Sequence, residues 1–215
     1  MSSSEQGGAD SAQRFGLEAV RATLGASSDV DACVTLTTRI DDLIGQAAAS
    51  LEEEGAGIAC RVGCNFCCHL RVMVFPHEAI ALFRYLGSRM PKEQAEIVRK
   101  RVLARDARVS NQACSFLVEG KCSAYEARPA ACSGYHSLSK EKCEESYHNG
   151  GHLPAGIPVL KALHFVAAAL DEGMEQGLNA AALSATRIEL NAAVAALIRN
   201  PGLIQRWRSG RELKI

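Results

Sequence analysis

The chain has 215 residues, of which 47% are hydrophobic and 22% charged, which is ordinary for a globular protein and short for two domains. Cationic and anionic side chains are equal in number, so the charge balance favours neither a nucleic acid nor a membrane surface as a partner. The N-terminal stretch lacks the apolar core of a secretory signal and no apolar run reaches membrane-spanning length, so we expect a cytoplasmic protein.

The sequence predicts that the first half of the chain is helical after a polar N-terminal stretch. Residues 1–12 are rich in serine, glycine and charge, and this composition predicts disorder. One helix is expected over 13–24, and a second from a Ser27–Ser28 cap to about Glu54. Cys33 belongs to the apolar stripe of the second helix and is interpreted as a core residue. The stripe, at spacings of three and four, consists of Cys33, Leu36, Ile40, Leu43, Ala47 and Leu51.

Two prolines mark the next helices. Pro76 is predicted to begin a helix that reaches about Arg89, and Pro91 another that ends near Val109. The basic run within the second of these is interpreted as a solvated helix face. The string LRVMVF before Pro76 is consistent with a short strand or with a buried connection.

The second half of the chain begins with a long irregular segment. Residues 110–157 show no sustained period, and a loop of this length is uncommon unless something organises it, as a bound metal would. Two alanine- and leucine-rich helices are expected beyond it, over 158–176 and 179–199. We therefore predict a mostly α fold: a single helical domain over 13–215, with an irregular cysteine-rich metal-binding patch at about 57–145 between helices.

Nine cysteines are the main chemical signal of the sequence. A reducing cytosol does not favour structural disulfides, and an odd number leaves one thiol unpaired, so clustered cysteines point first to metal binding or catalysis. The string CRVGCNFCC places four of them at intervals of four, three and one, and either a helical face or a turn at Gly63 would bring the sulfurs together. Four buried hydrophobic thiols within nine residues is the less favoured interpretation. The predicted ligands in this group are Cys60, Cys64, Cys67 and Cys68.

A second group contains Cys114, Cys122 and Cys132, at intervals of eight and ten. The string Glu119-Gly120-Lys121 is typical of a tight turn, which would let the first two cysteines face each other across a hairpin-like loop. Pro129 restricts Arg128 to an extended conformation. Arg128 is predicted either to offset the negative charge of nearby thiolates or to form a surface salt bridge with Glu126.

Cys143 follows as an eighth candidate ligand or a spare thiol. It precedes His148 and His152, but two glycines between these histidines argue against a helical histidine pair. His69 and His136 lie next to the cysteine groups and are possible ligands or outer hydrogen-bond donors. For each histidine, a solvated or hydrogen-bonded imidazole is the favoured interpretation.

At these residues the sequence resembles the CxxCxxCC cysteine-cluster family (YkgJ-like), whose members are described as zinc- or iron-chelating domains. The resemblance rests on CRVGCNFCC, on the helix start at Pro76–Glu78 and on CSFLVEGKCSAYEARPAAC, and it covers about residues 57–136. One departure is three residues, rather than two, between Cys60 and Cys64. The resemblance implies a metal-chelating or iron–sulfur module. A related cysteine pattern occurs in flagellin lysine-N-methylases, which keeps an enzymatic role open.

The number of cysteines bears on the metal. Seven or eight sulfurs exceed the four ligands of one zinc ion, although two zinc sites would fit. A [4Fe–4S] cluster also takes four cysteines. Adjacent Cys67 and Cys68 suit a multi-iron cluster, or two centres that share a wall, because neighbouring side chains tend to diverge. We therefore favour an iron–sulfur cluster, of the [4Fe–4S] type, over Zn²⁺.

The sequence thus predicts a metal-binding protein with a redox, sensing or structural role. One alternative is an enzyme that uses the centre, methyltransferase-like or an oxidoreductase, although no glycine-rich pattern for a nucleotide cofactor is present. Another is a metal-free dithiol protein that uses Cys64 with Cys67 or Cys67 with Cys68, although no βαβ pattern surrounds them. A protein partner is compatible with the sequence, which identifies none.

Overall fold

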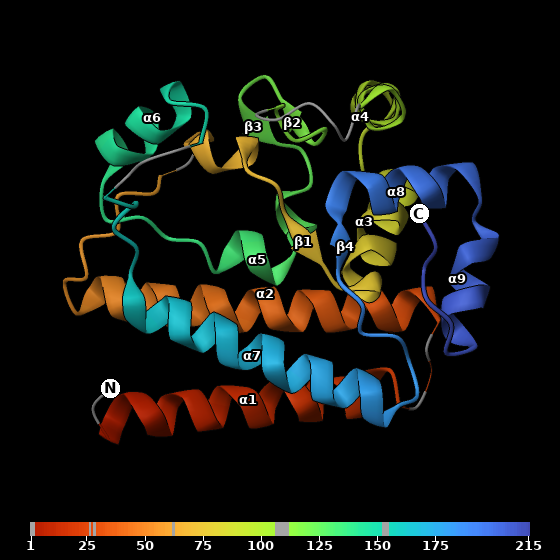
Figure 1. Cartoon of the computed structure of the whole chain (residues 1–215), viewed down its shortest axis with the longest axis horizontal. Helices are drawn as coiled ribbons and strands as arrows, with labels where there is room; N and C mark the ends of the chain where they lie inside the picture. The colour runs from red at the N-terminus through yellow and green to blue at the C-terminus, as the bar shows by residue number, and fades with distance from the viewer. Residues whose placement is uncertain (1–2, 26, 28, 62, 106–111, 152–154) are drawn as a thin grey trace.

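The computed structural model describes residues 3–25, 27, 29–61, 63–105, 112–151 and 155–215. Helices account for 63% of the chain, which confirms the mostly α prediction. None of the described helices is long and apolar enough to cross a membrane. The long helices α1 (Ser3–Thr23), α2 (Val30–Glu53) and α7 (Lys161–Ala180) lie side by side along one edge of the molecule, and the shorter elements cover the opposite edge (Figure 1).

Helices α1 and α7 approach each other unusually closely, because glycines face each other across the contact. A Cβ atom placed on Gly173 would lie 2.0 Å from the carbonyl oxygen of Gln13, and one on Gly16 would lie 2.5 Å from that of Leu170. Helix α1 begins at Ser3, not near residue 13, so its first turns occupy much of the stretch for which the composition predicted disorder. Ala12 is buried, which shows that this early part of α1 contributes to the core.

Helix α2 matches its predicted span, with a different cap. The Asp29 carboxylate accepts a hydrogen bond from Ala32 N at 2.8 Å, so Asp29 is the N-cap and not the predicted serine pair. Cys33 is fully buried, which confirms its assignment to the core. The second half of the buried stripe differs from the prediction, since Ile44 and Ala48 are buried while Leu43, Ala47 and Leu51 are half-buried.

The central helices follow the predicted proline starts. Helix α3 (Pro76–Ser88) is almost entirely buried along its first half, and α4 (Lys92–Ala104) follows it. The predicted end of the second helix, near Val109, lies outside the described residues. The short strand β1 (Met73–Val74) precedes α3 and pairs antiparallel with β4 (Ile188–Glu189).

The expected continuous helix over 179–199 is wrong. Helix α7 continues to Ala180, Ala182 then takes a positive φ of 55°, and α8 (Leu190–Arg199) begins only after β4. The break has a physical cause: strand pairing with β1 takes up residues 188 and 189, and the Glu189 carboxylate then caps α8 by accepting from Ala192 N at 2.7 Å. A final helix, α9 (Gly202–Arg208), buries Trp207 completely and was not predicted.

The cysteine-rich segment lies between helices, as predicted, and consists of short elements. None exceeds nine residues among those the structure describes. They are η1 (Phe66–His69), β2 (Leu117–Val118), β3 (Lys121–Cys122), η2 (Tyr125–Ala127), α5 (Ala130–Ser133) and α6 (Lys140–His148).

The close contact of α1 and α7 generates a stability prediction. Gly173→Ala should destabilise the fold by about 1–3 kcal/mol, because the added methyl group would collide with backbone that cannot move independently. Gly45→Ala is the matched control: Gly45 is helical and its Cβ position is empty within 4 Å, so this change should stabilise by up to about 1 kcal/mol. Urea unfolding of both variants measures the difference, and equal effects of the two changes would contradict the close packing.

A buried histidine generates a second prediction. His77 is fully buried, neither ring nitrogen has a hydrogen-bond partner, and desolvation lowers its pKa to about 3. Between about pH 6.5 and 3 the imidazole of His77 is therefore protonated in the unfolded chain and neutral in the folded chain. The free energy of unfolding falls by about 1.4 kcal/mol for each pH unit of acidification in this window.

His77→Phe should remove this slope, because phenylalanine does not titrate and retains the ring contact with Phe75, whose centroid lies 5.9 Å away. Urea unfolding at pH 7 and pH 5 measures this effect. The free energy of unfolding of the variant minus that of the wild type should be about 2 kcal/mol larger at pH 5 than at pH 7. The exposed His164 supplies the control, since His164→Gln should follow the wild type. Parallel pH profiles for His77→Phe and the wild type would show that His77 is not the acid-sensitive group.

Candidate metal centre

The turn η1 is the centre of the cysteine-rich region. It carries Cys67 and Cys68, and the backbone N–H of Cys114 donates to the carbonyl oxygen of Cys68 at 2.7 Å. This bond joins the two cysteine groups, which are 46 residues apart in the sequence. All nine cysteines are free thiols.

The turn predicted at Glu119-Gly120-Lys121 closes a hairpin, but Cys122 faces Leu117 across it and not Cys114, which lies before β2. Leu117 pairs with Cys122 across β2 and β3, and the turn residues Glu119 and Gly120 take positive φ angles of 50° and 75°. The Asn65 side chain donates to the carbonyl oxygen of Gly120 at 3.1 Å, which ties the hairpin to the start of η1.

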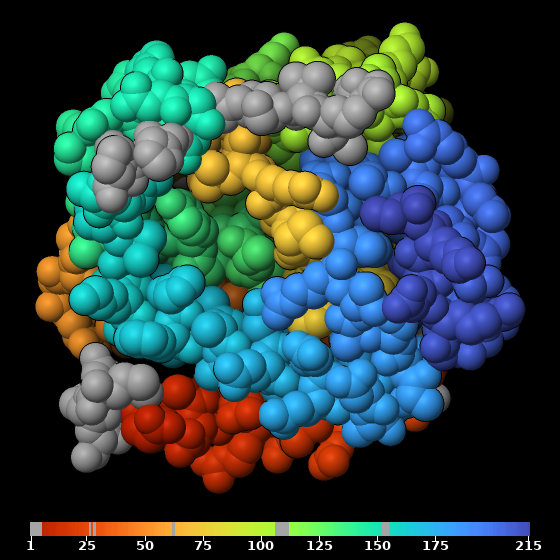
Figure 2. Space-filling view, in the orientation of Figure 1, coloured from red at the N-terminus to blue at the C-terminus, as the bar shows by residue number. Residues whose placement is uncertain are grey.

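Cys132 lies on the short helix α5, and a buried carboxylate holds that helix. Glu78 accepts hydrogen bonds from the backbone N–H groups of Phe75 and Ala130, both at 2.8 Å. Burial raises the pKa of Glu78 to about 7 even though both hydrogen bonds favour its charged form. Glu78 therefore fastens α3 to the helix that carries Cys132. Figure 2 shows α5, in green, on the floor of a hollow between the yellow η1–β1 segment and the cyan start of α7.

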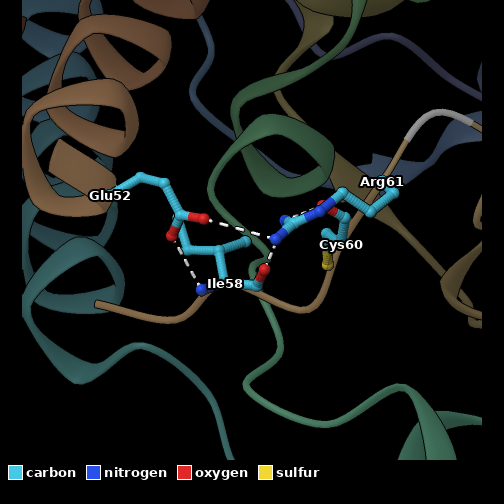
Figure 3. Close-up of polar contacts among 4 residues, drawn as sticks. All are labelled: Glu52, Ile58, Cys60 and Arg61. Carbon is cyan, nitrogen blue, oxygen red and sulfur yellow. Dashed lines mark hydrogen bonds and ion pairs between the residues drawn. The ribbon is translucent and has the colours of Figure 1, made fainter. Parts of the chain in front are cut away.

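Cys60 lies on the chain that leaves α2, and polar contacts fix that chain (Figure 3). Glu52 accepts from the backbone N–H of Ile58 at 2.8 Å and from the Arg61 guanidinium at 3.3 Å. Arg61 in turn donates to the carbonyl oxygens of Ile58 and Cys60. The Cys60 sulfur accepts a hydrogen bond from the backbone N–H of Ser137 at 3.3 Å. Cys60 is thereby positioned from two sides.

Cys143 is buried on the inner face of α6. The side chain of Ser139 caps this helix by accepting from Lys142 N at 3.2 Å, which sets where the helix starts. Cys143 and Cys67 line the same small cavity, together with His69 and Tyr135 among other residues. This places Cys143 in the cysteine-rich region, near the first cysteine group.

Arg128 is extended, as Pro129 predicted, and makes an ion pair with Asp41 of α2 at 3.2 Å, not with Glu126. Both side chains are about four-fifths buried, and the guanidinium lies 3.8 Å from the centre of the Tyr125 ring. Burial raises the pKa of Cys122, and the positive charge of Arg128 partly opposes this rise; at Cys67 the same charge adds to the larger lowering caused by Cys68. The predicted surface salt bridge with Glu126 is replaced by a largely buried pair with Asp41, and a role of Arg128 toward a metal centre stays a prediction.

The thiols differ in acidity. A hydrogen bond from Cys68 is the main cause that lowers the pKa of Cys67 to about 7, and the same bond raises the pKa of Cys68. Burial raises the pKa of Cys114 to about 11. Burial is also the main cause that raises the pKa of four further thiols, which are Cys60, Cys122, Cys132 and Cys143. Among the thiols whose pKa is shifted, Cys67 is the one whose pKa is lowered, which favours its thiolate form.

The histidines near the cysteines have mixed surroundings. The Nδ1 atoms of His69 and His136 are buried without a hydrogen-bond partner, and burial lowers the pKa of His136. His148 is exposed and lies 3.9 Å from Glu144. His152 lies outside the described residues. His69 and His136 are therefore the two candidates whose ring nitrogens are available.

Several residues that hold the site were not identified from the sequence. Asn191, at the start of α8, accepts from the backbone N–H of Ser115 at 3.0 Å, has its Oδ1 4.0 Å from the Cys114 sulfur, and donates to Glu189 at 2.8 Å. The side chain of Arg105 donates to the carbonyl oxygens of Gln112 and Ala113, just before Cys114. No local motif marks these residues, because their contacts with the segment around Cys114 reach over 7 to 77 residues of the sequence.

The donor set suits a thiophilic metal, although the sulfurs are not yet in ligand positions. Cys67 and Cys68 lie on η1, and Cys114 is hydrogen-bonded to Cys68; thiolates are ligands of zinc and of iron–sulfur clusters. Within the described part of the chain, no three His, Cys, Asp or Glu side chains form an arrangement ready to hold a metal ion. The residues therefore fit the metal by their chemistry, and binding requires the sulfurs to move together.

The structure is that of a helical protein with a thiol-rich segment between its helices. Residues 59–149 match the CxxCxxCC family model, described as "Putative zinc- or iron-chelating domain", which confirms the resemblance seen in the sequence. The match extends to the end of α6 and so includes Cys143. Comparison with curated proteins and with solved structures gave no significant match.

The Arg128–Asp41 pair generates a prediction about stability. In metal-free protein, Arg128→Gln should cost about 1–3 kcal/mol, because it leaves a largely buried carboxylate without its cation. Arg84→Gln is the control: Arg84 lies 3.7 Å from Asp31 with both side chains mostly exposed, so its loss should cost less than about 1 kcal/mol. Urea unfolding measures both, and a cost for Arg128→Gln as small as that of the control would make the buried pair energetically unimportant.

Proposed function

We propose that the protein holds an iron–sulfur centre of the [4Fe–4S] type through cysteine thiolates, with a redox, sensing or structural role in the cytoplasm. The observation that carries this proposal is the hydrogen bond from Cys114 to Cys68, which joins two distant cysteine-rich segments at η1, together with the free thiols of those segments. Zinc is the second candidate, since the family description names zinc and iron equally. When bound, either centre would cross-link these segments, and an iron–sulfur cluster would add one-electron chemistry.

The thiols themselves suggest how binding proceeds. The interaction with Cys68 lowers the pKa of Cys67, which favours its thiolate form. The remaining buried thiols give up their protons only when a cation offsets the resulting charge. The Arg128 guanidinium already opposes thiolate charge at Cys67 and Cys122. Metal affinity should therefore rise with pH as each thiol releases its proton.

One observation favours a metal-free alternative. Cys67 and Cys68 are consecutive residues of η1, and their interaction lowers the pKa of Cys67 and raises that of Cys68. A dithiol redox protein would use such a pair. An enzyme that uses the metal centre, such as a methyltransferase or an oxidoreductase, is a further candidate, and the described residues identify no substrate.

Anaerobic purification tests the proposal. Brown protein with iron and acid-labile sulfide in equal amounts, in multiples of about four per chain, would support it. Colourless protein with zinc would favour the second candidate. Protein that contains no metal and takes up none would overturn both and favour the dithiol alternative.

Two cysteine variants should lose metal. Cys64→Ser and Cys132→Ser are each expected to lower metal content and the melting temperature together, because metal-binding free energy is also folding free energy. Cys33→Ser is the matched control, since Cys33 is buried in α2 and should leave metal content unchanged. Elemental analysis and thermal melts check this, and full metal occupancy in either variant would remove that cysteine from the ligand set.

A further inference from the structure

We propose that Glu189, Leu190 and Asn191, where β4 leads into α8, are positioning residues for the metal centre. We name these three residues the α8 clamp. The clamp holds the chain that leaves η1 and the segment around Cys114 in fixed positions relative to each other. This inference deepens the proposed function and rests on it, and it assigns a role to residues outside the segment that matches the family model.

The first contact of the α8 clamp is with the chain that leaves η1. Glu189 pairs with Met73 across β1 and β4, and the N–H of Leu190 donates to the carbonyl oxygen of Val72 at 3.0 Å. Val72 lies only four residues after Cys68. The short connection from Cys68 is therefore held at its far end by β4, which lies beside β1 in Figure 1.

The second contact of the α8 clamp is with the segment around Cys114. The Oδ1 atom of Asn191 accepts from the N–H of Ser115 at 3.0 Å and lies 4.0 Å from the Cys114 sulfur. The Nδ2 atom of Asn191 donates to Glu189 at 2.8 Å, and the other oxygen of Glu189 accepts from Ala192 N at 2.7 Å. Because both ends of the amide have partners, its oxygen is held toward Cys114 and its nitrogen toward Glu189.

These contacts form a closed ring with the hydrogen bond that joins the two cysteine groups. The ring runs from Cys68 along the chain to the α8 clamp, from the clamp to Ser115, and from the N–H of Cys114 back to the carbonyl oxygen of Cys68 at 2.7 Å. Glu189 is 7% exposed and Asn191 is 4% exposed, so a broken hydrogen bond here would leave a buried polar group unpaired. The backbone of Cys68 and that of Cys114 are thus held as one unit.

The ring has a consequence for metal binding. Because no three donor side chains in the described ranges are already grouped around a metal position, the sulfurs have to move when a metal binds. The α8 clamp fixes the backbone from which two of them start. Coupling between two sites is reciprocal, so a bound metal that joins Cys68 and Cys114 should in turn stabilise the clamp.

The zinc affinity of the full chain, stripped of metal and kept reduced, tests the role of the α8 clamp. Asn191→Leu keeps a side chain of similar size and leaves the N–H of Ser115 and one oxygen of Glu189 without partners. Its affinity for Zn²⁺, measured by competition with a chelator, should be about 10–100-fold below that of the wild type.

Asn200→Leu is the matched control. Asn200 lies at the other end of α8, and its Oδ1 accepts from the N–H of Gly202 at 3.1 Å at the start of α9. This variant also loses a hydrogen bond from a helix end, and it should keep the zinc affinity of the wild type. A wild-type affinity for Asn191→Leu, or an equal loss in the control, would overturn the role of the clamp.

Thiol alkylation of the metal-free variant separates positioning from a general loss of stability. Read by peptide mass spectrometry, Asn191→Leu should raise the alkylation rate of Cys114 and leave that of Cys33 unchanged, since Cys33 is fully buried in α2 and reports loosening of the whole fold. Equal acceleration at both cysteines, or none at Cys114, would contradict a positioning role for Asn191.

Hydrogen exchange of the wild type tests the same coupling without any variant. Added Zn²⁺ should slow exchange of the N–H groups of Ser115, Leu190 and Ala192 and leave that of Gly202 unchanged. Zinc that binds without slowing these three would overturn the clamp and leave metal binding intact. No uptake of zinc, together with no iron after anaerobic purification, would instead overturn the proposed function and the clamp with it, so the two failures are distinguishable.

Discussion

The structure depends on one electrostatic constraint: many thiols lie close together in partly buried surroundings, where their charged forms repel each other. Burial raises the pKa of most of these thiols, so the metal-free protein keeps them neutral and stable as small hydrophobic side chains. The pKa of Cys67 is lowered instead, chiefly through its interaction with Cys68. A cation would reverse this balance, and the folded chain is therefore poised between a neutral thiol core and a thiolate metal site.

The supports of the site lie mainly in the helical frame. Glu78 of α3 holds α5, Asp41 of α2 holds Arg128, and Asn191 of α8 holds the backbone next to Cys114. Two of these three residues lie outside the segment that matches the family model. The helices on either side of that segment are thus part of the site, since they fix backbone that the short cysteine-bearing elements could not fix alone.

The close packing of α1 and α7 also affects the candidate metal centre, because α7 contacts the helices that position it. The glycine contact between α1 and α7 brings these helices to nearly backbone distance, and α7 also packs on α2 and α5. The α5 helix has only four residues, too few to be stable alone, so its position depends on this packing and on Glu78. The position of Cys132, which lies on α5, therefore depends on the same contacts.

The sequence by itself determined the helical class, the core role of Cys33, the tight turn at Glu119-Gly120-Lys121, and the family of the cysteine segment, because each depends on local spacing or turn chemistry. Only the tertiary structure decided which carboxylate pairs with Arg128, which residues hold α5, and where the chain breaks before α8. Those outcomes depend on partners 52 to 116 residues apart, which local periodicity does not specify. The placement of Cys143 beside Cys67 was decided in the same way, by the packing of α6 on η1.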